Sequence, residues 1–235
     1  MGKLCVTISS VFKHLLKHQF FSAFILSGTD FGQLKSSNTY FMNVLENKKI
    51  AILTDNGFEQ IELTSPKLAL EEAGATVHII SQQHMVKGWD HDHWGIEINT
   101  DVSLTNANPE DYDALMLPGG VMNPDKMRTE KAYVDFAQHF LETGKPLAAI
   151  CHAPQLLIET GMLSERNMTS YPSLKTDLKN AGVIWEDKEV VTDNGLVTSR
   201  SPEDLPAFNK KMIEEFAEGQ HLSDGSFKRG STSMG

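Results

Sequence analysis

Residues 144–161 read GKPLAAICHAPQLLIETG, and this stretch decides the fold. The run 146–150 is short and apolar, as in a strand that is buried on both faces of a parallel sheet. Cys151 follows it directly, and residues 153–159 predict a helix that ends at Gly161. The stretch therefore predicts a strand, a sharp turn that carries a thiol, and a helix.

Short apolar runs and amphipathic helices alternate on both sides of this stretch, and parallel strands need such helical crossovers. We therefore predict an α/β fold: a flavodoxin-like three-layer sandwich with a mostly parallel, doubly wound sheet. Its ligand site is expected at the carboxyl ends of the strands. The predicted strands are 49–54, 75–80, 114–117, 146–150, 183–185, 189–191 and 196–199, and the predicted helices are 64–73, 129–142, 153–159, 174–180 and 202–216.

Composition excludes several classes of protein. The chain has 235 residues and a net charge of -10, which argues against a nucleic-acid-binding surface, because phosphate binding needs a basic face. No apolar run is long enough to span a membrane. The two cysteines, Cys5 and Cys151, exclude a disulfide framework and favour a reducing compartment, so we predict a cytoplasmic protein.

Charge and composition divide the chain into three parts. Residues 1–47 hold four lysines against Asp30 and Glu46, and we interpret them as a basic N-terminal extension. It could be an exported signal, an organellar presequence, or chain that precedes a natural start at Met42. Residues 48–218 form the predicted domain, and the glycine- and serine-rich residues 219–235 form a predicted disordered tail.

Cys151 is the first candidate catalytic residue. The backbone N–H groups and the dipole at the start of a helix stabilise a thiolate, so the turn should lower the pKa of this thiol and make it a nucleophile. The alternative is an ordinary buried cysteine. A strand–thiol–helix turn is the arrangement that exposes a nucleophile at the top of an α/β sheet, and it favours the functional interpretation.

Two further segments could complete such a site. Residues 117–121, LPGGV, follow another predicted strand, and the backbone N–H of Gly120 could form an oxyanion hole with that of His152. Taken alone, the paired glycines could equally belong to a plain loop. Glu59 and Glu62 stand at a helix N-terminus, where acids are usually solvated, but one that faces the crevice would be a general acid or base.

Residues 89–94, WDHDHW, have side chains that could bind a metal. They fall in a predicted hairpin loop, where alternating residues place at most two ligands on one side. We therefore expect a solvated loop and no metal site.

Several segments together resemble the PfpI family, the intracellular-protease-like and Parkinson-protein-like deglycase branch of the class I glutamine amidotransferase-like superfamily. The resemblance covers nearly all of residues 48–217. The segments are KKIAILTDNGFEQIEL, YDALMLPGGVMNPDKMR, GKPLAAICHAPQLLIETGML and NAGVIWEDKEVVTDNGLVTSRSPEDLPAF, in that order.

The resemblance implies a flavodoxin-like homodimer or higher homo-oligomer with a site on the cysteine. Cys151 matches the family's nucleophile, Glu62 the acid that hydrogen-bonds the sulfur, and His152 the histidine after the nucleophile. Gly120 matches an oxyanion-hole amide. Asp125 stands where protease-like members place an acid, often a longer Glu, that reaches the histidine of a neighbouring subunit. Glu59 is a secondary acid, and no metal or organic cofactor is implied.

Glutaminase activity is not expected, because no histidine falls in the late loop 199–203. His152 should be a poor base for Cys151 of its own chain, since neighbouring side chains on a tight turn diverge. Three hypotheses remain. The first is a stress-protective enzyme on reactive carbonyls or early glycation adducts, through a Cys151 thiolate with Glu62 as acid and base. The others are a cysteine peptidase with an intersubunit triad, and a non-catalytic redox sensor or holding chaperone.

Overall fold

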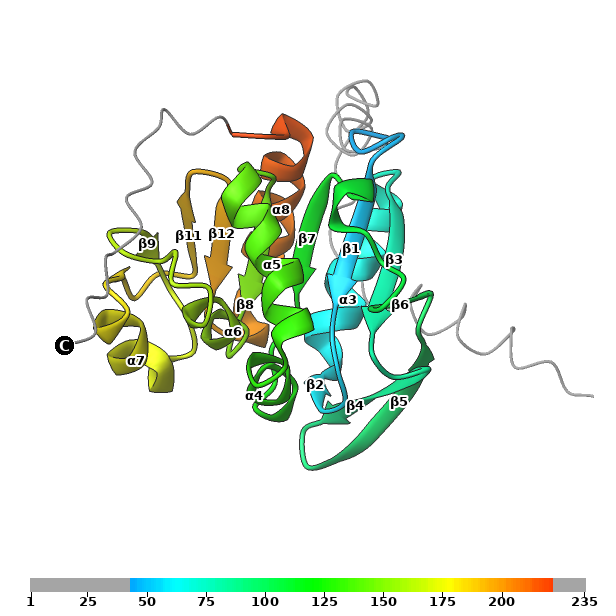
Figure 1. Cartoon of the computed structure of the whole chain (residues 1–235), viewed down its shortest axis with the longest axis horizontal. Coiled ribbons are helices and arrows are strands. Elements are labelled where there is room, and N and C mark those ends of the chain that lie inside the picture. Colours follow the sequence, from blue (N-terminus) through cyan, green and yellow to red (C-terminus); the bar gives the residue numbers. More distant parts are fainter. Residues whose placement is uncertain (1–42, 222–235) are drawn as a thin grey trace, which may run out of the picture. The chain divides into compact units, whose positions relative to one another are not determined.

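The computed structural model of the protein describes residues 43–221 (Figure 1). Most of the predicted N-terminal extension and most of the predicted tail lie outside these residues. Within 43–221, every helix is too short or too polar to span a lipid bilayer.

A seven-stranded sheet forms the middle layer, in the order β11-β12-β8-β7-β1-β3-β6 (Figure 1). All its neighbouring strands are parallel except the edge pair β11 and β12. The strands are β1 (Lys49–Leu53), β3 (Thr76–Ser81), β6 (Val102–Ser103), β7 (Ala114–Leu117), β8 (Leu147–Ile150), β11 (Val190–Asp193) and β12 (Leu196–Ser199). The mostly parallel, doubly wound sheet predicted from the sequence is confirmed.

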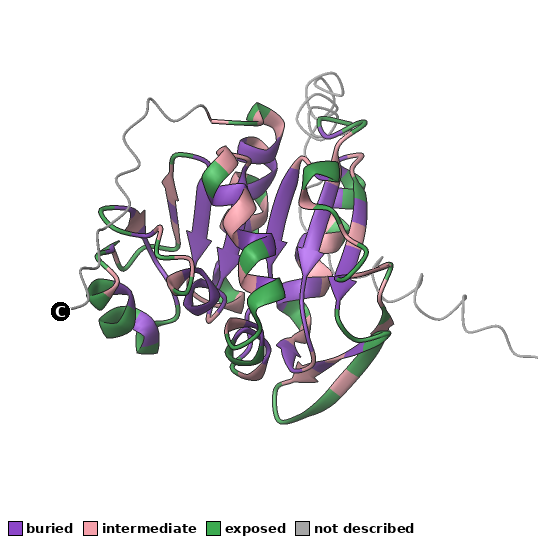
Figure 2. Ribbon diagram, viewed as in Figure 1, coloured by how far each residue is buried: buried purple, intermediate pink, exposed green. Residues whose placement is uncertain are grey.

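Helices cover both faces of this sheet, and its strands are buried between them (Figure 2). Alternate residues of β1 show the two faces: Ala51 and Leu53 belong to one core cluster, and Ile50 and Ile52 to the other. The first core is completed by α4 (Met122–Arg128), α5 (Lys131–Thr143), α6 (Pro154–Ile158) and α7 (Lys175–Asn180), and the second by α3 (Gln60–Glu72) and α8 (Leu205–Glu218). This is the three-layer sandwich that the alternating pattern predicted.

Two small sheets and three short 3₁₀ helices complete the described residues. One sheet joins β2 (Phe58–Glu59), β4 (Met85–Asp90) and β5 (His93–Asn99), and the other joins β9 (Asn167–Met168) and β10 (Ile184–Trp185). Strands β4 and β5 form an antiparallel hairpin beside β2. The 3₁₀ helices are η2 (Pro109–Asp111), η3 (Pro172–Leu174) and η4 (Pro202–Asp204).

The folded part of the chain extends beyond the predicted domain at both ends. Leu45, which we assigned to the extension, is fully buried, and its N–H donates to Ala73 O at 2.9 Å. His221, which we assigned to the tail, donates its N–H to Gly144 O at 2.8 Å. Residues 43–47 and 219–221 therefore belong structurally to the folded unit.

Candidate active site

The turn between β8 and α6 holds Cys151 in an unusual backbone conformation. Its φ is 63°, in the left-handed region that non-glycine residues rarely adopt. Its N–H donates to Ser199 O at 3.0 Å, so the neighbouring strand β12 holds the turn. The residue is only 6% exposed. Strained backbone of this kind clusters at functional sites, and here it turns the thiol out of the strand direction at the carboxyl end of β8.

The turn after β7 passes directly between Cys151 and Glu62. Gly119 N–H donates to Glu62 Oε2 at 3.1 Å. A Cβ atom at Gly119 would lie 2.5 Å from Glu62 Oε2 and 2.6 Å from Cys151 Cβ, so only glycine fits there. The next backbone N–H, that of Gly120, points to the sulfur, as does that of His152. The two N–H groups predicted to form an oxyanion hole therefore converge on the thiol.

A buried asparagine holds this turn in place. Asn123 is fully buried, and its Nδ2 donates to Pro118 O at 2.8 Å and to Gly119 O at 3.2 Å. Its Oδ1 accepts from Asp55 N at 2.7 Å. Asp55 in turn accepts from the Tyr133 hydroxyl at 2.9 Å. This network ties the turn after β7 to the end of β1.

The carboxyl of Glu62 and the thiol of Cys151 interact in a dry environment. Glu62 is fully buried in the first turn of α3, and burial raises its pKa to about 8, so it is protonated at neutral pH. Burial and then the neighbouring Glu62 raise the pKa of Cys151, and the N–H groups of Gly120 and His152 oppose this shift. Our prediction of a lowered thiol pKa is wrong for this resting state, because desolvation outweighs the two N–H groups.

The ring of His152 contacts the thiol of the same chain. Its Nδ1 lies 3.2 Å from Cys151 Sγ, and its Nε2 lies 3.3 Å from Ser173 Oγ. The ring stacks on Tyr171 at 4.5 Å between centroids and 23° between planes. Burial lowers the pKa of His152, which favours the neutral ring. The prediction that the two neighbouring side chains diverge is wrong, because the left-handed backbone of Cys151 brings them together.

A pocket of about 420 Å³ opens in front of these groups. Glu59 lies at its wall, and burial raises the pKa of this carboxyl, while His91 lowers it. The described residues that line the pocket include no lysine or arginine, so it carries carboxyl groups without a fixed positive charge. They are Gly57, Glu59, Glu62, Trp89, His91, Gly120, Val121, Met122, Cys151, His152, Tyr171 and Pro202.

Asp125, the proposed intersubunit acid, is exposed in the first turn of α4 and does not line this pocket. It lies four residues beyond Val121, which does. A contact between Asp125 and His152 of a second subunit stays a prediction.

The predicted hairpin forms between β4 and β5, and residues 91–94 are exposed, but part of the hairpin also reaches the pocket. Trp89 and His91 line the pocket, because β4 pairs with β2 next to Glu59. His91 lies 3.7 Å from Asp90 and His93 lies 2.9 Å from Asp92, so the histidines face their own neighbours. The residues in 43–221 that bring three metal-ligating atoms together lie elsewhere, at the end of α8.

Several residues in or around the pocket escaped the sequence analysis. Tyr171 and Ser173 reach His152 from the connection between β9 and α7, and their positions follow from tertiary structure alone. Asn123 carries no motif that marks it. Trp89 and His91 were visible as an unusual cluster, but the pairing of β2 with β4 that aims them at the cysteine was not.

This fold and this geometry define a class of protein, in which a flavodoxin-like sandwich carries a thiol at a strand–helix turn beside a buried glutamic acid. A sequence profile described as the DJ-1/PfpI family matches residues 48–215, and the chain belongs to this family. The resemblance inferred from the sequence is thereby confirmed.

Individual relatives and solved structures are similar to this chain over most of its length. An uncharacterized protein of Staphylococcus haemolyticus is 44% identical over 170 residues, which are 72% of this chain and 97% of that protein. The crystal structure of Drosophila melanogaster DJ-1beta is 32% identical and superposes with a TM-score of 0.66, covering 72% of this chain and 90% of that one. A two-domain protein from Anabaena variabilis, with DJ-1/ThiJ/PfpI-like and ferritin-like domains, is 35% identical with a TM-score of 0.69. The match covers 76% of this chain and 50% of that protein.

Proposed function

We propose that this protein is a cysteine-dependent enzyme that acts on small reactive carbonyls, such as methylglyoxal, or on their early adducts with amines. One observation carries the proposal: Sγ of Cys151 lies 3.2 Å from Nδ1 of His152, beside the protonated carboxyl of Glu62, in a single pocket. A nucleophile, a base and an acid are thus available to one small substrate.

The first step is addition of the sulfur to the aldehyde carbon. With its hydrogen on Nε2, donated to Ser173 Oγ, the His152 ring leaves Nδ1 free to accept the thiol proton. The sulfur is then a thiolate only as it attacks, which suits a thiol whose resting pKa is raised. The N–H groups of Gly120 and His152 stabilise the oxygen on which negative charge develops.

The second step moves a proton between the two carbons of the ketoaldehyde. A proton leaves the carbon bound to sulfur and another reaches the former ketone carbon, so the first carbon is oxidised and the second reduced without an external oxidant. Glu62 is protonated at rest and first gives its proton to the oxygen of the adduct. Its carboxylate then takes the proton from the carbon bound to sulfur and gives it to the former ketone carbon, and a pKa of about 8 suits both transfers. Water then cleaves the thioester, which yields lactate and restores the thiol.

With an amine adduct, the former aldehyde carbon already carries a hydroxyl and the nitrogen, so sulfur displaces the amine: the C–S bond forms as the C–N bond breaks. Glu62 gives the proton that the leaving nitrogen needs, and the resulting hemithioacetal follows the path described above. A free amino group is thereby restored. The pocket favours neutral or cationic substrates over anionic ones. Glu59 lies at its wall, and no lysine or arginine among the described lining residues offsets the negative charge of this carboxylate. Like charges in a partly dry pocket disfavour binding of a carboxylate or phosphate.

The other two hypotheses gain less support. The peptidase needs an acid from another subunit to orient His152, but Ser173 of the same chain already lies at Nε2. The redox sensor needs a thiolate at rest, and burial raises the pKa of Cys151 in the opposite direction. We therefore rank turnover of carbonyls first.

The test is the conversion of methylglyoxal by the full-length chain, with lactate measured by NMR. Cys151→Ala should abolish the reaction, and Cys5→Ala, which removes the other thiol of the chain, should leave it unchanged. Release of lysine from its methylglyoxal adduct is measured in parallel. The proposal fails if neither reaction occurs, or if both survive in Cys151→Ala.

A further inference from the structure

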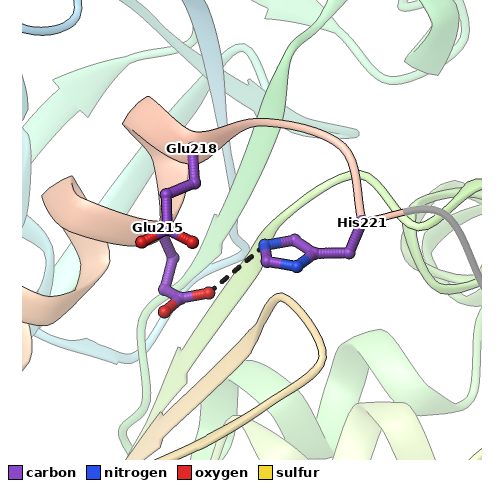
Figure 3. Close-up of side chains that lie close together, drawn as sticks. All are labelled: Glu215, Glu218 and His221. Carbon is purple, nitrogen blue, oxygen red and sulfur yellow. Dashed lines mark ion pairs between the residues drawn. The ribbon is translucent and has the colours of Figure 1, made fainter.

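A second group of chemically active side chains lies at the opposite end of strand β8 from Cys151. Glu215 and Glu218 belong to the last turn of α8, and His221 follows the helix (Figure 3). Gly144, to which His221 N–H donates, precedes β8, whereas Cys151 follows the carboxyl end of that strand. The chemistry proposed for Cys151 makes no use of this group.

The three side chains turn toward one another (Figure 3). Nε2 of His221 and Oε2 of Glu215 are 3.3 Å apart. Each of the three residues offers one donor atom, and these three atoms lie within 4.8 Å of one another. Zinc binds imidazole nitrogen and carboxylate oxygen at about 2.0–2.2 Å, so donors around one ion are about 3–4 Å apart. Small side-chain movements are enough to close on an ion.

The imidazole is held in place rather than left in solvent. Gln220 Nε2 donates to Thr143 O at 2.6 Å, and His221 N–H is fixed on Gly144 O at 2.8 Å. The ring lies against the turn between β11 and β12, where a Cβ atom at Gly195 would come within 2.7 Å of its Cδ2. The position of the ring, and therefore of Nε2, is fixed by the fold.

The polar atoms of this group are incompletely partnered among the described residues. Nε2 of His221 is buried and makes no hydrogen bond, because its approach to Glu215 lacks hydrogen-bond geometry. The side chain of Glu215 is only 6% exposed, and Lys211 lies 3.1 Å from its Oε1, which leaves Oε2 facing the imidazole.

The charge around this group is also unbalanced. Glu218 adds a second carboxylate beside Glu215, and both stand at the C-terminal end of α8, where the helix dipole favours a cation. The two nearby lysines are both shared with other acids: Lys211 also pairs with Glu214 at 3.4 Å, and Lys48, beside Gly219, pairs with Asp113 at 3.6 Å.

We propose that Glu215, Glu218 and His221 form a binding site for a divalent transition-metal ion of the Zn²⁺ type. A nitrogen donor among two carboxylates favours zinc and its neighbours over Mg²⁺ and Ca²⁺, which take oxygen ligands. Because Glu218 is exposed, water can occupy the remaining positions. The ion would tie the segment after α8 to the helix and leave the thiol site untouched.

The test is calorimetric titration of ZnCl₂ into the full-length chain with both cysteines replaced by serine, because thiolates bind zinc themselves. We expect one binding site. His221→Ala and Glu218→Gln should each lower its zinc affinity by more than about 100-fold, because losing a residue that only supports a ligand already costs about 10- to 100-fold. Lys211→Met should instead tighten binding, because it frees Oε1 of Glu215. MgCl₂ should show no binding at the same concentrations.

Glu214→Gln is the matched control, since it removes the same charge from the same turn without removing a donor of the site. Because Glu214 also pairs with Lys211, its replacement should change the affinity far less than Glu218→Gln does. The proposal is overturned if zinc does not bind, if His221→Ala binds as tightly as its parent, or if Glu214→Gln weakens binding as much as Glu218→Gln. Glu218 is exposed, so Glu218→Gln should keep the fold, and its effect on binding reports on the site itself.

Discussion

Nδ1 of His152 lies 3.2 Å from Sγ of Cys151, the residue that directly precedes it. Two adjacent side chains can meet in this way because Cys151 has a φ of 63°. The ring is fixed on its other side by Tyr171 and at its far nitrogen by Ser173. The thiol and the imidazole that we propose as its base therefore meet within one turn of one chain.

Ser173 should act as a positioning residue through the tautomer of His152. Ser173→Ala removes one hydrogen bond worth about 1 kcal/mol, so we expect kcat to fall about fivefold with KM unchanged. Ser173→Thr keeps the hydroxyl and should restore kcat. If Ser173 had only a structural role, Ser173→Ala would lower stability instead of lowering kcat at constant KM. Thermal unfolding of both variants checks this. Equal kcat in Ser173→Ala and in the unchanged protein would contradict the assignment.

Glu62 makes stability depend on pH in a defined direction. Its carboxyl loses its proton near pH 4.5 when unfolded and near pH 8 when folded. Between these values the folded state binds more protons than the unfolded state, so the free energy of unfolding should fall as pH rises. Glu62→Gln cannot titrate and should lack this contribution. Urea unfolding of both proteins from pH 5 to pH 8 measures it, and parallel curves for the two proteins would contradict the raised pKa.

Asn123 should be essential for the shape of the site. Asn123→Ala leaves Pro118 O and Asp55 N without their partner and removes one of the two donors to Gly119 O, whose other donor is Glu59 N. Each buried group left unpaired costs about 1–3 kcal/mol, so we expect the free energy of unfolding to fall by about 2 kcal/mol or more.

Asn209→Ala is the control for this variant. Asn209 is half-buried, and it donates one hydrogen bond, to Ser65 Oγ at 2.9 Å. Its replacement should cost about 1 kcal/mol. Urea denaturation measures the free energy of unfolding of both variants. Equal decreases would contradict the claim that the hydrogen bonds of Asn123 stabilise the turn more than an ordinary side-chain hydrogen bond does.

Much of the fold was predictable because its signals are local. The strands 114–117 and 196–199 were predicted with their observed bounds, since each is a short run that is buried on both faces. Helix α4 was missed, because MNPDKMR shows no helical periodicity and contains a proline. The pairing of β2 with β4 depends on residues 30 positions apart, and no local pattern shows it.

The candidate site was predictable only in part, for a similar reason. Cys151, Glu62 and Gly120 stand at the ends of predicted elements, and the topology of a parallel sheet brings such ends together. The convergence of His152 on the thiol follows from one backbone angle that the residue types do not reveal. The raised pKa of Cys151 results from burial by the whole fold, which outweighs the local effect of the helix start.

The central claim is that the Cys151 sulfur bonds to the carbonyl carbon before Glu62 moves the proton. Its most direct test uses Glu62→Gln, which keeps the shape of the side chain but cannot transfer that proton, and should lower kcat by about 10²- to 10⁴-fold. Rapid acid quench of this variant with methylglyoxal, followed by peptide mass spectrometry, should show one substrate molecule added at Cys151. Full turnover by Glu62→Gln, or turnover by the unchanged protein with no adduct at Cys151 in either protein, would contradict the account.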